Sequence, residues 1–182
     1  MRYMDTAAAI ASGSAGERRM PGDFEAFWGL RRDGSAEGLG VSLAPVGIPS
    51  EAARYHELSV ALTGGRELRA RYVRPATDDP VPLVVMFPDA EQGVRGWHHL
   101  TRFVALGQAV VMLDGRDLGL AGMDLAAGWD EAPEGLALAG LVTDALRLTR
   151  ASLGLPGIDH AHVSAFGDGL GGGLAIAVAA LL

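Results

Sequence analysis

Pro82-Leu83-Val84-Val85-Met86-Phe87 is an apolar run that no polar residue interrupts, and Ala109-Val110-Val111-Met112-Leu113 is a second one. Strands with one face in water alternate polar and apolar residues, whereas strands covered on both faces are apolar throughout. Between the two runs, residues Trp97 to Leu106 carry apolar side chains at helical spacing. These three segments therefore predict a strand, a helix and a second strand parallel to the first.

The chain continues in the same manner toward its C-terminal end. A helical pattern covers about Leu136 to Leu153, a third apolar run covers Ala161 to Phe166, and a last apolar segment covers Leu170 to Leu182. We expect a helix, a third strand and a final helix from these segments. A strand–helix alternation of this kind is typical of a doubly wound parallel sheet.

The region before the first apolar run has a different character. Asp23 precedes aromatic residues at helical spacing, Phe24, Phe27 and Trp28, which predicts a short amphipathic helix with Asp23 as its cap. The Gly-rich stretch from Arg31 to Ser50 is expected to be a connection.

Two further segments, Tyr55 to Leu62 and Glu67 to Val73, flank the turn sequence Thr63-Gly64-Gly65-Arg66. The second segment alternates apolar residues with Arg69 and Arg71, and this alternation together with a Gly-Gly turn predicts an antiparallel hairpin. The expected fold is thus an α/β protein, a three-layer α/β/α sandwich in which an antiparallel hairpin is followed by parallel strands.

Length and composition exclude several classes of function. The 182 residues, 49% of them hydrophobic, suffice for one domain, which we place at 21–182 after a disordered leader at 1–20. A net charge of −7 offers no basic surface for nucleic acid or an anionic membrane. Without cysteine, disulfide and thiolate chemistry is excluded. No apolar stretch reaches the length of a bilayer span, so we expect a cytoplasmic protein.

The turn between the last predicted strand and helix carries the chemistry of interest. It reads Phe166-Gly167-Asp168-Gly169-Leu170-Gly171-Gly172-Gly173, and three interpretations compete for it. The glycines can serve a tight turn alone. They also satisfy the G-x-G-x-x-G pattern of dinucleotide-binding proteins, although that pattern needs an acidic residue about 20 positions further on. The third interpretation is a nucleophile elbow, G-x-S-x-G, in which Gly169 occupies the serine position.

Several segments resemble the acetyl xylan esterase / cephalosporin C deacetylase family of α/β-hydrolases. The resemblance rests on their shared order along the chain: Pro21 to Trp28, Thr63-Gly64-Gly65, Val84 to Phe87, Leu113-Asp114-Gly115-Arg116 with Gly119, Val142 to Ala145, Ile158-Asp159 and Gly171 to Ala175. The resemblance implies the N-terminal half of an α/β-hydrolase fold and, for the family, a carboxylic ester hydrolase (deacetylase) activity.

The same resemblance implies that the catalytic groups are missing. Gly169 stands where the family has its nucleophilic serine, and the oxyanion loop Pro88-Asp89-Ala90-Glu91-Gln92 lacks the family's tyrosine. The two carboxylates of that loop would repel a developing oxyanion. The family's triad Asp and His are expected beyond residue 182. We therefore expect no catalysis by this chain alone.

Carboxylates lie near both loops. Asp168 adjoins the elbow as a conceivable carboxylate nucleophile, but it precedes the tip of the turn. Asp89, Glu91 and Asp168 form a possible acidic rim at the carboxyl edge of the sheet.

The sequence contains two pairs of histidines, His98-His99 and His160 with His162. The second pair, two positions apart, can present metal ligands on one strand face, but a solvated or packed role is favoured. We expect neither a metal nor a cofactor.

The predicted edge of the sheet indicates a partner. Ala161 to Phe166 is expected to be an exposed apolar edge strand, and Leu170 to Leu182 has no polar face. We expect another polypeptide to cover both segments, either a hydrolase subunit or a second copy of this chain. The resulting hypothesis is a non-catalytic pseudo-subunit. The alternatives are a component of an ester hydrolase completed by its partner, and a protein that binds a nucleotide or small ligand at the Gly-rich turn.

Overall fold

The computed structural model describes residues 21–90, 94–115, 120, 122–128 and 132–182. By its internal contacts the chain divides into two compact units, residues 1–30 and 31–182. The leader expected at 1–20 lies outside the described residues.

The helix predicted after Asp23 is present as α2 (Phe24–Gly34). Its aromatic side chains pack against one another within the first turn and a half. The rings of Phe24 and Phe27 both meet Trp28 edge-on, with centroids 6.4 Å and 5.1 Å away. The aromatic spacing that predicted the helix therefore also produces its side-chain contacts.

The expectation of a plain connection from Arg31 to Ser50 is wrong. Helix α2 extends to Gly34, and residues Gly40–Pro45 form a strand, β1, which pairs antiparallel with β2 (Ala53–Ala61). The alternation of Val41 and Leu43 with Ser42 fits a strand. Backbone pairing with β2 is what makes this Gly-containing segment regular, because main-chain hydrogen bonds do not depend on side-chain identity.

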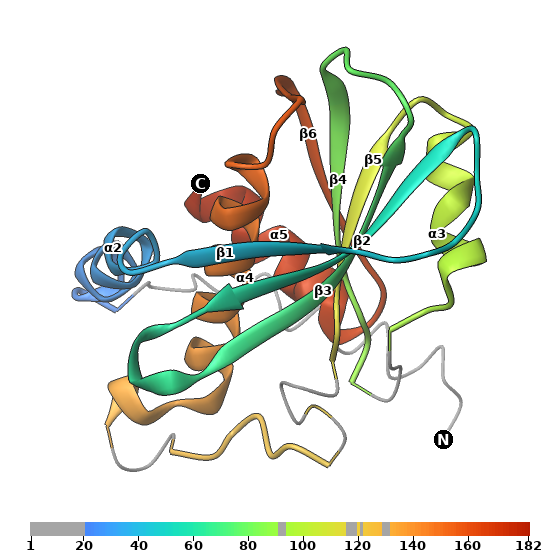
Figure 1. Cartoon of the computed structure of the whole chain (residues 1–182). Coiled ribbons are helices and arrows are strands. Elements are labelled where there is room, and N and C mark those ends of the chain that lie inside the picture. Colours follow the sequence, from blue (N-terminus) through green and yellow to red (C-terminus); the bar gives the residue numbers. More distant parts are fainter. Residues whose placement is uncertain (1–20, 91–93, 116–119, 121, 129–131) are drawn as a thin grey trace, which may run out of the picture. The chain divides into compact units, whose positions relative to one another are not determined.

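The sheet has six strands in the order β1-β2-β3-β5-β4-β6 (Figure 1). The predicted hairpin is confirmed, since β2 pairs antiparallel with β3 around a short 3₁₀ turn at Thr63–Gly65. The predicted parallel arrangement is confirmed as well, because β5 and β6 both pair parallel with β4. The bounds of these strands are β3 (Glu67–Pro75), β4 (Val81–Phe87), β5 (Ala109–Leu113) and β6 (Ile158–Gly167).

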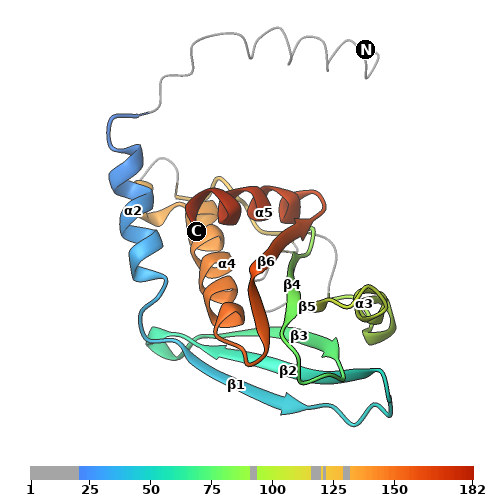
Figure 2. The ribbon, with the colours of Figure 1, turned by 90° about the horizontal axis from the view of Figure 1, so that it is seen from above.

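Helices cover the two faces of this sheet. Helix α3 (Trp97–Val104) packs on β3 and β5, while α4 (Ala137–Leu153) and α5 (Leu170–Leu181) lie on the other side, α5 against β4 and β6 (Figure 2). The three-layer α/β/α sandwich is therefore confirmed. Among the described residues, no helix combines the length and the apolar character that a membrane crossing requires.

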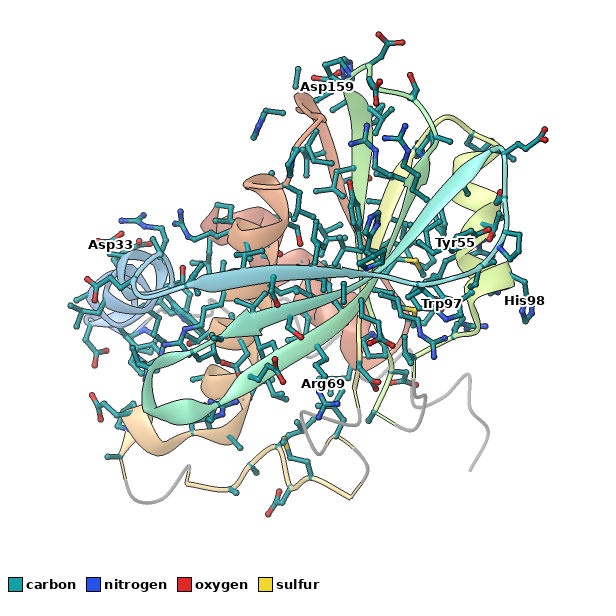
Figure 3. The ribbon with its side chains drawn as sticks, viewed as in Figure 1. Asp33, Tyr55, Arg69, Trp97, His98 and Asp159 are labelled. Carbon is teal, nitrogen blue, oxygen red and sulfur yellow. The ribbon has the colours of Figure 1, made fainter. Side chains whose placement is uncertain are left out.

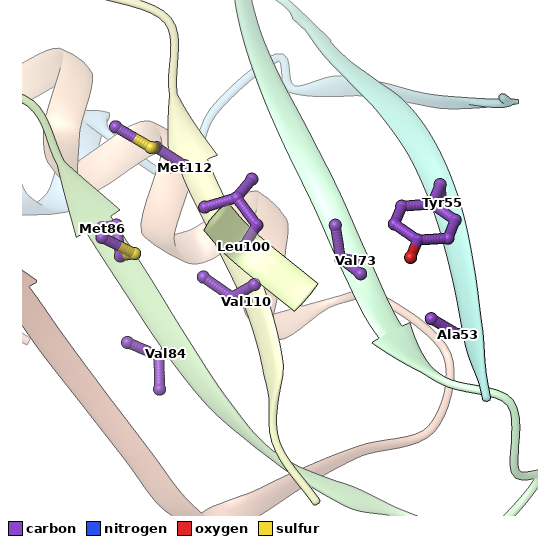
Figure 4. Close-up of a cluster of buried hydrophobic side chains, with 8 residues drawn as sticks. All are labelled: Ala53, Tyr55, Val73, Val84, Met86, Leu100, Val110 and Met112. Atoms are coloured by element: carbon purple, nitrogen blue, oxygen red, sulfur yellow. The ribbon is translucent and has the colours of Figure 1, made fainter. Parts of the chain in front are cut away.

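The layer between α3 and the sheet is built around Leu100, which is fully buried (Figure 4). Side chains from four strands surround it: Ala53, Tyr55, Val73, Val84, Met86, Val110 and Met112. Strands β2, β4 and β5 each contribute two residues that are two positions apart, as the pleat of a sheet requires, and β3 contributes Val73. The cluster fixes α3 on its face of the sheet.

Polar contacts hold the beginning of α3 in place. The Tyr55 hydroxyl lies 3.1 Å from Thr101 Oγ1, and its ring meets Trp97 edge-on at 5.9 Å (Figure 3). Arg71 donates to the Arg95 carbonyl oxygen at 2.6 Å and lies 4.8 Å from the centre of the Trp97 ring. The C-terminal end of the connection between β4 and α3 is thus tied to β2 and β3.

Leu100→Ala should destabilise the fold by about 3 kcal/mol, because it removes buried methyl groups and leaves a cavity under α3. Urea denaturation followed by circular dichroism measures the loss. Leu106→Ala is the matched control, since Leu106 is 72% exposed just beyond the same helix and should change the free energy of unfolding by less than about 0.5 kcal/mol. Equal effects of the two substitutions would contradict the described packing.

Candidate functional site

The ends of β4 and β6 lie beside each other. In their parallel register Phe87 is opposite Gly167, so the segments that follow, 88–90 and 168–170, leave the sheet together. The strand after β4 along the chain, β5, lies on the other side of β4 from β6. The chain therefore leaves β4 toward one side and enters β6 on the other. In open α/β sheets, ligands usually bind in the crevice outside the carboxyl ends of such a pair of strands.

The turn from β6 into α5 has the backbone of a nucleophile elbow. Gly169 has φ +53° and ψ −123°, a conformation that residues with a side chain adopt only under strain. Gly171 permits a close approach, because a β-carbon there would overlap the Phe87 carbonyl oxygen and lie 2.7 Å from that of Pro88. The turn is built as the sequence pattern predicted, with a hydrogen atom where a nucleophile's side chain would begin.

The Asp89 carboxylate occupies the space above Gly169. Asp89 Oδ1 accepts hydrogen bonds from the backbone N–H of Leu170 at 2.9 Å and from that of Ala90 at 2.8 Å. A β-carbon placed on Gly169 would lie 2.6 Å from Asp89 Oδ2, closer than real β-carbons come to any atom outside their neighbouring residues. The carboxylate therefore fills the volume that a side chain at position 169 would need.

The electrostatics of this contact favour the charged carboxylate. The hydrogen bond from the Leu170 N–H, followed by that from the Ala90 N–H, holds the pKa of Asp89 below its ordinary value. The Leu170 amide also belongs to the first turn of α5, where the helix dipole favours negative charge. Asp89 is thus ionised at neutral pH and bound to the elbow.

The other acidic residues predicted at this edge are placed differently. Asp168 is 63% exposed, and its Oδ2 lies 4.0 Å from Arg95 Nη2 in a solvent-screened ion pair. Glu91 and Gln92 lie outside the described residues. The structure therefore brings Asp89 and the elbow together, whereas the Asp168 side chain is directed toward solvent and Arg95.

The histidine pairs lie elsewhere. His162 Nδ1 is 2.7 Å from Asp159 Oδ2, and this hydrogen bond holds the pKa of Asp159 below its ordinary value. Asp159 is near the start of β6, at the opposite end of the strand from the elbow (Figure 3). The pKa of His99 is lowered by burial. Within the described part of the chain, no three metal-ligating side chains of His, Cys, Asp or Glu gather into one group.

The sequence pattern did not reveal the contact between Asp89 and Leu170. It located both loops and predicted that the carboxylates of one would oppose an oxyanion at the other. The hydrogen bond between the Asp89 carboxylate and the Leu170 amide depends on the register of β4 with β6. No local sequence pattern contains this register. The nearest signal was the expectation of adjoining carboxyl ends in a parallel sheet.

The mixed sheet, the helices on its two faces and the sharp turn after β6 define an α/β-hydrolase fold. A family model for acetyl xylan esterases matches residues 11–182. The chain therefore belongs to the acetyl xylan esterase family. No curated protein matches the sequence.

Several solved structures share this fold. Acetyl xylan esterase 1 from Thermoanaerobacterium sp. JW/SL YS485 is 24% identical, with a TM-score of 0.78 over 91% of this chain and 56% of that one. The acetyl xylan esterase from Paenibacillus sp. R4 is 20% identical, with a TM-score of 0.75 over 89% and 56% of the two chains. A glucuronoyl esterase from Solibacter usitatus is 12% identical, with a TM-score of 0.54 over 84% and 54%. This chain thus spans little more than half the length of these relatives.

The Asp89 titration should be visible at the two amides that it accepts from. Because the pKa of Asp89 is depressed in the folded protein, its stabilising contribution is present above the unfolded-state pKa and is lost as pH falls through the lower folded value. In ¹H–¹⁵N spectra recorded as the pH falls, the Leu170 and Ala90 signals should move together with a midpoint below that of an ordinary aspartate. Asp168→Asn should leave the midpoint nearly unchanged, and a midpoint above the ordinary value would contradict the described hydrogen bonds.

Proposed function

We propose that this chain is a non-catalytic member of the acetyl xylan esterase family that associates with another polypeptide. The observation that carries the proposal is the Asp89 carboxylate above Gly169, bonded to the Leu170 and Ala90 amides. Ester hydrolysis at an elbow needs a nucleophile at its tip and free donors for the oxyanion. Position 169 supplies no side chain, and the Leu170 amide is already bonded.

A substitute nucleophile finds little support at this turn. Asp168 is exposed and faces Arg95, and it precedes the elbow tip by one residue. Asp89 lies above the tip, but its charge is neutralised in part by two hydrogen bonds, and a carboxylate held in this way is a weak nucleophile. Both carboxylates therefore fit a structural role better than a catalytic one.

The nucleotide-binding alternative conflicts with the same contact. Phosphate binds at helix N-termini through free backbone N–H groups. At the start of α5 the Leu170 N–H donates to Asp89, whose negative charge would repel a phosphate. Binding of an anionic ligand at Gly167 to Gly172 would require Asp89 to leave first.

Strand β6 supports the association with a partner. Among the described residues it pairs with β4 alone, and Val163 and Phe166 are 37% and 42% exposed. Hollows flank it on both faces. One of about 430 Å³ lies between β6 and helices α4 and α5, and one of about 610 Å³ lies between β6 and the region of α3. An unpaired apolar strand of this kind favours pairing with a further strand.

The exposed side chains of α5 extend the same surface. Ile176 is 75% exposed and Leu182 is 50% exposed, while Leu174 and Val178 are buried. Covering such side chains contributes about 1.5–3 kcal/mol each. The partner we propose is a hydrolase-type chain that supplies a strand beside β6, with a second copy of this chain as the alternative.

The purified chain should not hydrolyse p-nitrophenyl acetate above the rate of buffer, because position 169 lacks a nucleophile. Spectrophotometric assays of the wild type and of Asp89→Ala and Asp168→Ala should give the same baseline. Turnover by the wild type that one of these substitutions abolishes would contradict the proposal. Activity that appears only with a partner chain would instead support the alternative of an ester hydrolase completed in trans.

Phe166→Glu should weaken association, because it places a charge on the exposed side of β6. Size-exclusion chromatography with multi-angle light scattering should show the wild type in a complex, and the variant shifted toward the monomer by about tenfold in Kd. Val41→Glu is the matched control, since Val41 is similarly exposed at 45% on the opposite edge strand, β1. A wild-type chain that stays a stable monomer at micromolar concentration would contradict the proposed association.

A further inference from the structure

Asp89 and Gly169 belong to loops that follow different strands, yet they compete for one volume. A β-carbon on Gly169 would overlap Asp89 Oδ1 and Cγ and would lie 2.6 Å from Oδ2. The three nearest atoms are all in the carboxylate, so the closest conflict is with this side chain. With Asp89 in its observed position, glycine is the one residue that fits at 169.

The carboxylate lies where two backbone donors converge. Oδ1 accepts from Ala90, in the loop after β4, and from Leu170, the residue after the elbow tip. In α/β-hydrolases the amide after the nucleophile and an amide from an earlier strand–helix loop form the oxyanion hole. The Asp89 oxygen therefore takes a position equivalent to that of a substrate's oxyanion.

We infer that Asp89 is a permanent internal ligand of the Leu170 and Ala90 amides and that glycine at position 169 is what allows it to bind there. This inference deepens the proposed non-catalytic function and rests on it. The two positions act as a coupled pair. A serine introduced at 169 alone would collide with the Asp89 carboxylate, and the two amides that could stabilise an oxyanion would still be bonded to that carboxylate. Both positions must therefore change before a side chain and an oxyanion can be accommodated at the elbow.

A double-mutant cycle on thermal stability tests the coupling. Gly169→Ala should lower the Tm by about 5–10 °C, through backbone strain and the collision with Asp89. Asp89→Ala should lower it by about 2–4 °C through lost hydrogen bonds. The Tm of the double variant should be at least about 3 °C higher than the sum of the two single shifts predicts. The backbone strain that Gly169→Ala introduces is present with or without Asp89, whereas the collision occurs only when Asp89 is present.

Gly172→Ala is the matched control for the cycle. Gly172 lies in the first turn of α5, three residues after Gly169, and a β-carbon there would meet Gly167 rather than Asp89. Its effect should add to that of Asp89→Ala within about 1 °C. Additive shifts for the pair Asp89 and Gly169 would overturn the inference.

Amide hydrogen exchange in the wild-type background provides a second measurement that does not require the Gly169 variant to fold. Asp89→Ala should speed exchange at Leu170 and Ala90 by about tenfold or more, whereas Asp168→Ala should not. Unchanged exchange in Asp89→Ala, or an equal effect of both substitutions, would overturn the inference. Neither the Tm cycle nor the exchange rates depend on activity. Ester hydrolysis by the wild type would refute the proposed function, whereas the coupling of Asp89 with Gly169 is decided by these two measurements alone.

Discussion

Parallel pairing of β4 with β6 is the constraint on which the elbow depends. It sets Phe87 beside Gly167, so the two strands end at the same level and their loops leave the sheet together. Only then can the Asp89 carboxylate reach the Leu170 amide, a contact between residues 81 positions apart in sequence. The absence of a side chain on Gly171 lets α5 come close to the end of β4 and completes this arrangement.

The far end of the connection between β4 and α3 is fixed by different means. Arg71 in β3 donates to the Arg95 carbonyl oxygen, and Tyr55 in β2 bonds Thr101 within α3. The antiparallel half of the sheet therefore contributes to the geometry of the parallel half. Through these contacts the first strands of the fold help to hold the end of the connection that carries Asp89.

The sequence predicts those strands whose burial is visible in their residue types. Strands β4 and β5 were predicted from unbroken apolar runs because both of their faces are covered, and β2 with β3 from alternation around a Gly-Gly turn. Strand β1 was missed because its regularity comes from backbone pairing with β2. At the elbow, the pattern located Gly169 and the loop containing Asp89, and it predicted that the carboxylates of this loop would repel an oxyanion. It could not show that Asp89 fills the site, because that depends on strand register and loop direction.

Gly169 has a consequence for how this protein can evolve. In an active hydrolase, a side chain held at a positive φ stores strain that the rest of the fold must offset. A glycine in the same bend removes that strain, and such relief widens the margin above the threshold at which mutations unfold a protein. A protein with this glycine can therefore accept substitutions on other surfaces that a relative with a strained side chain at the same bend would lose to selection.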